Sequence, residues 1–341
     1  MALTIELGPL PLELGPLLVA SGLAFHGLRK KSLSPSGAAT AFAVGYLMLS
    51  GALYVFGVTL IVFYLVGSRA TKFGNARKAQ LESAYHAAGY GYRTGWQVLS
   101  NSAPALVAAL AWNAVYAPHS LPGRLVGGAL RDPGVTALPA LLHAPVYAQR
   151  GGPRWCPAAP YPAPGPVLSR PLLFAALGHF ACCLGDTLAS ELGILARGQP
   201  RPTPPAVLVL RAVPPGTNGA LSLPGTLASV AGGALVGLAA AAALVWENGV
   251  CARQAGGLLA ELVCAGAACG GGGSLLDSVL GATVQETRYD ADRKQILSDE
   301  EPDAHTREPT HLLGLPLLTN NAVNVVSSVV TATVAAWLAA A

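Results

Sequence analysis

The sequence predicts an all-α integral membrane protein, a bundle of about six to eight transmembrane helices rich in glycine and alanine, some of them short or re-entrant. Of the 341 residues, 52% are hydrophobic and 11% are charged, whereas about a quarter of the residues in a soluble domain are charged. Residues 286–308 hold eight of the seventeen acidic residues. The rest of the chain therefore contains apolar runs of about 20 residues, the length that crosses a bilayer as a helix.

Seven apolar runs are candidate membrane segments. They are residues 10–28, 37–67, 98–117, 167–196, 223–245, 256–284 and 312–341. The run 37–67 is too long for one untilted span and too short for two, so we expect a steep tilt or a re-entrant hairpin near Ser50 and Gly51. The run 256–284 has the same ambiguous length. The 40 glycines and the long alanine runs predict closely packed helices.

The whole chain, residues 1–341, is expected to form a single membrane domain with two polar segments. Residues 118–166 are rich in proline and arginine, which predicts a poorly ordered loop insertion. Residues 286–311 predict an acidic, solvated loop, with a regulatory or cation-binding segment as the alternative.

The charge pattern favours lipid and phosphate partners. The net charge is only +4, and the basic residues form short clusters between apolar runs, which suits anionic lipid head groups or phosphates. No nucleic-acid-binding signature occurs, so membrane lipid is the expected partner. Residues 29–31, 69–93 and 124–170 would alternate between the two sides if each intervening run spans once. The positive-inside rule therefore assigns no orientation from the sequence.

The cysteines and the N-terminal segment bear on the compartment. The six cysteines include no CxxC pair and no accompanying histidine spacing, so we interpret them as small buried residues without a metal or redox role. Glu6 and Glu13 precede the first apolar run and a basic triplet follows it, an order typical of a retained membrane segment. The chain shows no Arg- and Ser-rich presequence, so an endomembrane such as the endoplasmic reticulum is the expected location.

Two acidic residues interrupt apolar runs. Asp186 lies in ACCLGDTLASELG and Asp277 in GGGGSLLDSVLGATVQ. A lone carboxylate at the bilayer centre costs about 2.5 to 3.5 kcal/mol, so it is usually paired, hydrated or liganded. We expect a cation or phosphate site, with a structural hydrogen bond between helices as the alternative. Ser190 shares a helical face with Asp186, and Glu191 lies on a neighbouring face. The glycines before Asp277 predict either a phosphate-contacting loop or plain packing or a helix break.

Other polar groups are candidate ligand contacts. Arg69 and Lys72, in GSRATKFGNARK, could clamp a phosphate or simply anchor head groups, and Asn101 follows in WQVLSNS. Asn218 lies in a turn, PPGTNGA. The asparagines near the last apolar run could bind a polar ligand or bond neighbouring helices, and they are Asn320, Asn321 and Asn324.

These motifs, in this order, resemble the transmembrane protein 19 family, which includes members described as phytyl-phosphate kinases. The six motifs are GSRATKFGNARK, WQVLSNSAPA, GDTLASELG, PPGTNGALS, GSLLDSVLGATVQ and LLTNNAVNVVSS. The GDxxAS element is also similar to one in CTP-dependent dolichol and phytol kinases. The resemblance implies nucleotide and metal binding at Gly185, Asp186, Ala189 and Ser190, and it suggests that Asp277 and Asn321 join the polar cavity. Thr319 stands where a family-typical acid precedes the paired asparagines.

Two functional hypotheses follow. In the first, Asp186, Glu191 and Asp277 hold Mg²⁺ on a nucleoside triphosphate, and Lys72 or Arg69 screens the phosphates. An isoprenoid monophosphate, already anionic, attacks from the lipid side and needs no general base. In the second, the same acids bind a coupling cation in a membrane transporter or lipid-handling protein.

Overall fold

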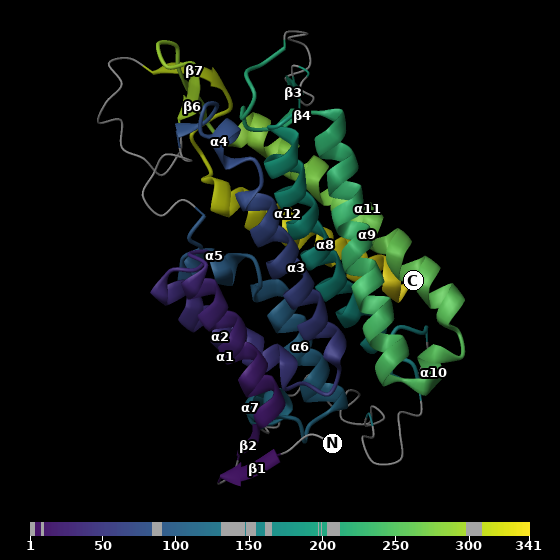
Figure 1. Cartoon of the computed structure of the whole chain (residues 1–341). Helices are drawn as coiled ribbons and strands as arrows, with labels where there is room; N and C mark the ends of the chain where they lie inside the picture. The colour runs from purple at the N-terminus through teal and green to yellow at the C-terminus, as the bar shows by residue number, and fades with distance from the viewer. Residues whose placement is uncertain are drawn as a thin grey trace.

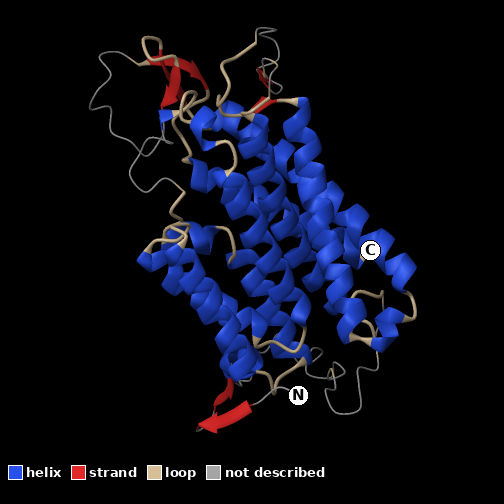
Figure 2. Cartoon of the chain, in the orientation of Figure 1, coloured by secondary structure: helices blue, strands red, loops and turns tan. Residues whose placement is uncertain are grey.

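The computed structural model describes residues 4–7, 10–83, 91–130, 147, 155–160, 166–196, 198, 200–202, 212–297 and 309–341. Helices dominate these residues, and short strands lie at the two ends of the bundle (Figure 2). The helices are α1 Leu14–Arg29, α2 Pro35–Leu49, α3 Tyr54–Lys72, α4 Asn75–Lys78, α5 Gly95–Ser100, α6 Ala103–Tyr116, α7 Leu121–Leu130, α8 Ser169–Gly193, α9 Leu223–Glu247, α10 Gly249–Ala252, α11 Ala255–Val284 and α12 Asn320–Ala340.

Five of these helices are long and apolar enough to cross a membrane within the described residues, namely α3, α8, α9, α11 and α12. The apolar helices α2 and α6 are shorter. Helix α8 lies in the middle of the bundle and contacts α3, α6, α9, α11 and α12 (Figure 1). The predicted helical membrane bundle is therefore confirmed.

The run 37–67 folds as the helical hairpin of α2 and α3, and not as one tilted helix. Helix α2 ends at Leu49 and α3 begins at Tyr54, so the break includes Ser50 and Gly51. The backbone N–H of Ala52 donates to Asn113 Oδ1 at 2.9 Å, which satisfies a turn group that has no helical partner. A buried asparagine on α6 thus fixes the turn.

The run 256–284, in contrast, forms one continuous helix of 30 residues. Its length is about 45 Å, more than the hydrocarbon core needs. Residues 270–273 lie inside this helix, so two of the three alternatives for these glycines, a phosphate-contacting loop and a helix break, are wrong. The backbone N–H groups of these glycines belong to the helical ladder, and the alternative of close packing is confirmed for Gly270, Gly271 and Gly273.

Glycines bring α9 and α11 into backbone contact. A Cβ atom on Gly233 would lie 2.1 Å from the carbonyl oxygen of Gly266, and one on Gly270 would lie 2.5 Å from the carbonyl oxygen of Ser229. Gly237 is equally close to Leu262. Both helices therefore present glycines four residues apart, the spacing with which membrane helices pack most closely.

The bundle has two distinct ends. The first, called the sheet end, carries the antiparallel sheet β6–β5–β7, formed by Gln295–Leu297, Thr287–Asp290 and Thr310–Leu313. The described part of segment 286–311 is therefore a sheet and not the open loop that we expected. Residues 298–308 lie outside the described residues. The short pair β3 (Arg201–Pro202) and β4 (Ala220–Leu221) precedes α9 at this end.

The other end, called the disulfide end, carries a bond between Cys156 and Cys251. This bond corrects our interpretation that every cysteine is a simple buried residue. Asn248 Nδ2 donates to Tyr147 Oη (3.1 Å) and to the Trp155 carbonyl (2.9 Å). The hairpin β1 (Thr4–Leu7) and β2 (Leu10–Glu13) also lies at this end (Figure 1).

The described part of segment 118–166 packs at the disulfide end. It includes α7 and an aromatic cluster in which both Tyr147 and Trp155 pack against Trp112 of α6. Residues 131–146, 148–154 and 161–165 lie outside the described residues, so the expected disorder there stays a prediction.

Candidate functional site

Asp186 and Asp277 come together from α8 and α11. Ser274 Oγ donates to Asp186 Oδ1 at 3.5 Å, and Ser327 Oγ of α12 donates to Asp277 Oδ2 at 2.8 Å. In the amide orientation that satisfies both its polar atoms, Asn324 Nδ2 also donates to Asp277 Oδ2, at 3.1 Å. Ser274 is three residues before Asp277 on α11, so its contact with Asp186 brings the two carboxylates into the same part of the bundle. We call these five residues the acid cluster.

Helical spacing and glycines assemble the acid cluster. Ser274 and Asp277 are three residues apart on α11, as are Asn324 and Ser327 on α12, so each pair shares a helix face. Close approach of α8 to α11 needs small residues: a Cβ atom on Gly185 would lie 2.7 Å from the Gly270 carbonyl oxygen. Gly185, predicted as a ligand contact, therefore packs against a neighbouring helix.

The acid cluster lies nearer the sheet end than the disulfide end. Asp186 is seven residues before Gly193, the last residue of α8, and Asp277 is seven residues before Val284, the last of α11. At the helical rise these distances are about 10 Å. Both aspartates are partly exposed. The cluster therefore lies within reach of the polar boundary at the sheet end.

The donor atoms of the acid cluster fit Mg²⁺ bound together with a phosphate ligand. Carboxylate, hydroxyl and amide oxygens are the ligands that Mg²⁺ prefers. Among the described residues, no group of three or more His, Cys, Asp or Glu has the arrangement of a metal site. Mg²⁺ is commonly held by only one or two carboxylates, with phosphate oxygens and water completing its shell. Asp186 and Asp277 match that pattern.

Glu191, also predicted as a metal ligand, faces a lysine. Lys78 Nζ lies 2.6 Å from Glu191 Oε2 and also donates to the carbonyl oxygens of Ala70 (3.0 Å) and Thr71 (3.3 Å). Lys78 is 0% exposed and Glu191 is 9% exposed. The lysine therefore binds the last carbonyls of α3 as well as the carboxylate. Nothing in the local sequence distinguished Lys78 from its exposed basic neighbours.

The predicted phosphate clamp is not brought onto the acid cluster. Arg69 is exposed and its Nη1 donates to the Leu65 carbonyl at 3.2 Å. Lys72 is exposed and its Nζ donates to the Lys30 carbonyl. Neither side chain forms an ion pair with an acidic residue in the described part of the chain. Both lie at the sheet end, where α1 and α3 end.

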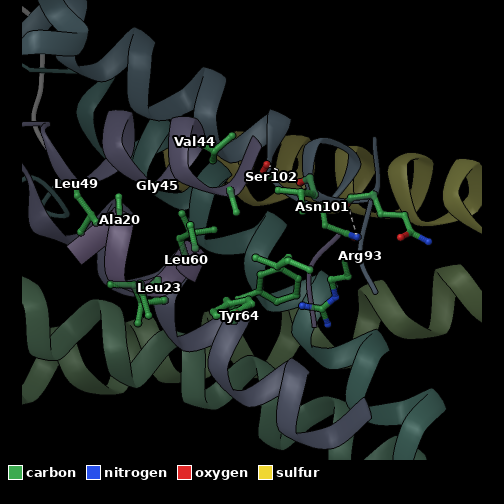
Figure 3. Close-up of a pocket in the computed structure, with 17 residues that line it drawn as sticks. Ala20, Leu23, Val44, Gly45, Leu49, Leu60, Tyr64, Arg93, Asn101 and Ser102 are labelled. Atoms are coloured by element: carbon green, nitrogen blue, oxygen red, sulfur yellow. Dashed lines mark hydrogen bonds between the residues drawn. The ribbon is translucent and has the colours of Figure 1, made fainter. Parts of the chain in front are cut away.

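Asn101 lines a separate, largely apolar cavity between α1, α2, α3 and α5 (Figure 3). In Figure 3, Arg93 and Asn101 lie toward one side of this cavity, and Ala20 and Leu49 toward the other. Asn101 Nδ2 donates to the Gln97 carbonyl at 2.9 Å. The Arg93 guanidinium lies 5.7 Å from the centre of the Phe63 ring. The sequence pattern does not distinguish Arg93 from other basic residues, because only the fold places it beside this cavity.

The remaining predicted contacts have local roles. Ser190 is exposed, and its Oγ donates to the carbonyls of Asp186 (3.0 Å) and Thr187 (3.2 Å). Asn218 Nδ2 donates to the Glu286 carbonyl at 3.0 Å, which ties its turn to β5. At the start of α12, Asn320 is exposed and Asn321 is partly buried. The Asn320 carbonyl accepts from Asn324 Nδ2 in the same amide orientation of Asn324.

Three further residues of this region have roles that the sequence pattern suggested. Thr319, at the place of the family-typical acid, is the N-cap of α12: its Oγ1 accepts from the Ala322 N–H at 3.4 Å. Ser274 and Ser327 were not among the residues predicted from the sequence. Their spacing of three residues from Asp277 and Asn324 was the available signal.

Comparison with known proteins identifies the family. Residues 18–332 match the family described as integral membrane protein DUF92. Protein PGR of Arabidopsis thaliana is 29% identical over 317 residues, which cover 92% of each chain. A protein described as an uncharacterized membrane protein of Methanocaldococcus jannaschii is 34% identical over 143 residues, 38% of this chain and 50% of that protein. No solved structure matches. This chain therefore belongs to the integral membrane protein family DUF92 and is a multi-pass membrane protein.

Proposed function

We propose that this protein is a membrane phosphotransferase that moves the γ-phosphate of CTP, or another nucleoside triphosphate, onto an isoprenoid monophosphate. The observation that supports this function is the convergence of Asp186 and Asp277 from two membrane helices into one cluster of oxygen donors. Charged residues at membrane depth are rare and mostly functional. The resemblance to the transmembrane protein 19 family supplies the substrate class.

Asp186 and Asp277 are the residues that would hold Mg²⁺, which supplies charge neutralisation on the phosphate oxygens when it is bound. Ser274 and Ser327 each donate to one of these carboxylates and so fix their orientation. An oxygen of the isoprenoid monophosphate bonds to the γ-phosphorus while the bond from that phosphorus to its bridging oxygen breaks. The products are an isoprenoid diphosphate and a nucleoside diphosphate. Because the nucleophile is an anion, the site needs positioning and no general base.

The position of the acid cluster suits an amphiphilic substrate. The isoprenoid chain would remain in the bilayer, and its phosphate would lie at the polar boundary. Helix α11 is about 45 Å long and extends beyond a hydrocarbon core of about 30 Å. Aspartates about 10 Å from the ends of α8 and α11 can therefore lie at the level of that phosphate. We place this activity in an endomembrane such as the endoplasmic reticulum.

The test is transfer of labelled phosphate by purified protein. Labelled CTP, ATP and GTP are offered separately with phytyl and geranylgeranyl monophosphate. We expect transfer that needs Mg²⁺ and that falls about 100-fold or more in Asp186→Asn and in Asp277→Asn. Asp292→Asn is the matched control, because Asp292 is an exposed carboxylate in the turn between β5 and β6, outside the cluster. It should keep the wild-type rate.

If the folded wild-type protein, which shows a cooperative unfolding transition, transfers no phosphate from any of the three donors, the proposal is contradicted. The same acidic residues would then be better explained by cation binding in a transporter or lipid-handling protein. Equal activity in the wild type and both aspartate variants would also contradict the assigned site.

A further inference from the structure

We infer the orientation of the protein in its membrane: the disulfide end faces an oxidising compartment and the sheet end faces the cytosol. Two independent observations lead to this assignment, one from cysteine chemistry and one from the distribution of charge. The orientation itself does not depend on the proposed function.

The first observation is the bond between Cys156 and Cys251. Cys251 lies in α10, in the short connection between α9 and α11, and both cysteines are 0% exposed. The bond joins residues 95 apart in the sequence. Disulfides persist in the endoplasmic reticulum lumen and outside the cell, and are rare in the cytosol. The connection between α9 and α11 is therefore expected on the lumenal or external side.

The second observation is the distribution of basic residues. Of the fifteen lysines and arginines in the described residues, twelve lie at the sheet end. Three lie at the C-terminal end of α1, at residues 29–31, five lie in the segment from Arg69 to Arg93, one lies in β3 and three lie in the β5–β6 hairpin. The three at the disulfide end are Arg124, Arg170 and Arg253. An excess of basic residues marks the cytosolic side, and acidic residues have little effect on this rule.

The hairpin of α2 and α3 explains why the sequence did not reveal this asymmetry. The two basic clusters at residues 29–31 and 69–93 would lie on opposite sides if run 37–67 crossed once. Because that run forms a helical hairpin, the end of α1 and the end of α3 lie at the same end of the bundle, and so do the two basic clusters. Lys72 Nζ donates to the Lys30 carbonyl, and Leu33 forms a bridge with Arg93. These contacts place the ends of α1 and α3 together.

The orientation assigns a side to the acid cluster. Asp186 and Asp277 lie near the sheet end, so a water-soluble ligand would reach them from the cytosol. In the terms of the proposed function, on which this one step rests, the nucleoside triphosphate is taken from the cytosol. The disulfide end would then contribute stability and no part of the phosphate site.

Thiol labelling in sealed microsomes tests the orientation without any activity measurement. Arg124→Cys and Ala291→Cys each place a thiol at an exposed position, at the disulfide end and the sheet end respectively. The background carries alanine in place of the four free cysteines, Cys182, Cys183, Cys264 and Cys269. We expect a membrane-impermeant maleimide to label Ala291→Cys in intact vesicles and Arg124→Cys only after permeabilisation. Labelling with the reverse pattern, or of both positions in intact vesicles, would overturn the inference.

Two measurements on the wild-type chain guard against a misfolded variant. Trypsin added outside intact microsomes should cut in the β5–β6 turn at Arg293 or Lys294, and protection of this turn until permeabilisation would overturn the orientation. Alkylation of denatured protein should also gain two thiols on reduction, from Cys156 and Cys251. Free thiols at both positions would remove the chemical basis of the assignment. Because none of these readouts involves catalysis, they separate a wrong orientation from a wrong function.

Discussion

Lys78 offers the sharpest test of the structure, because it is a lysine buried completely at the sheet end. Its Nζ donates to Glu191 Oε2 at 2.6 Å and to the carbonyls of Ala70 and Thr71 at 3.0 and 3.3 Å. Lys78→Met keeps the length of the side chain but removes the charge and these hydrogen bonds. Glu191, 9% exposed, then loses the cation that faces it.

The expected loss of stability is large. Removing one partner of a buried ion pair costs about 3 to 5 kcal/mol, because the other charge remains in a poorly hydrated site. Replacing both partners, in Lys78→Met with Glu191→Gln, removes that charge as well. The remaining cost is then about 1 to 2 kcal/mol for the two lost carbonyl hydrogen bonds. The double variant should therefore be more stable than Lys78→Met alone.

The assay is the free energy of unfolding in detergent, measured by denaturant titration with tryptophan fluorescence. Lys72→Met is the matched control, since Lys72 is an exposed lysine near the same helix end and its loss should change stability by about 0.5 kcal/mol or less. Equal free energies of unfolding for Lys78→Met and Lys72→Met would refute the reasoning. So would purely additive effects, in which the double variant loses as much stability as the two single variants, Lys78→Met and Glu191→Gln, lose together.

Two further predictions concern packing and the disulfide. Gly270→Leu should separate α9 from α11 and lower the free energy of unfolding by about 3 kcal/mol or more, because its Cβ would lie 2.5 Å from the Ser229 carbonyl oxygen. Gly272→Leu is the control, since a Cβ atom on Gly272 has no other atom within 4 Å, and it should melt like the wild type. Similar melting curves for both variants would argue against the close helix contact. Replacing Cys156 and Cys251 by serine should lower the stability by about 2 to 4 kcal/mol, and reductant should lower the melting midpoint of the wild type but not of this variant. A midpoint insensitive to reductant in both would show that the bond contributes nothing.

Local pattern was sufficient for the class of fold and for several positions within it. Hydrophobic runs of membrane length identify spanning helices, because every backbone polar group in a bilayer must be bonded within its own helix. The length of run 37–67, longer than one span and shorter than two, left a steep tilt or a hairpin near Ser50 and Gly51 as alternatives, and the structure decided for the hairpin. Asp186 and Asp277 stood out for a similar reason, as carboxylates in apolar runs are costly without a partner.

The tertiary structure decided which distant residues meet. Lys78 pairs with Glu191 and Cys156 bonds to Cys251, and both pairs depend on how helices far apart in the sequence lie side by side. The glycines at 270–273 could equally have formed a loop. The packing role of Gly270 and Gly273 follows from the position of α8 and α9 against α11.

The same distinction explains the acid cluster and the charge asymmetry. The sequence alone determined that a membrane protein carries isolated acidic residues and several basic clusters, because composition and helix periodicity are local properties. Only the fold determined that Ser274 and Ser327 are the partners of these acids, and that the α2–α3 hairpin gathers the basic residues at one end. Partner choice depends on helix arrangement in three dimensions, which the periodicity of a single helix does not contain.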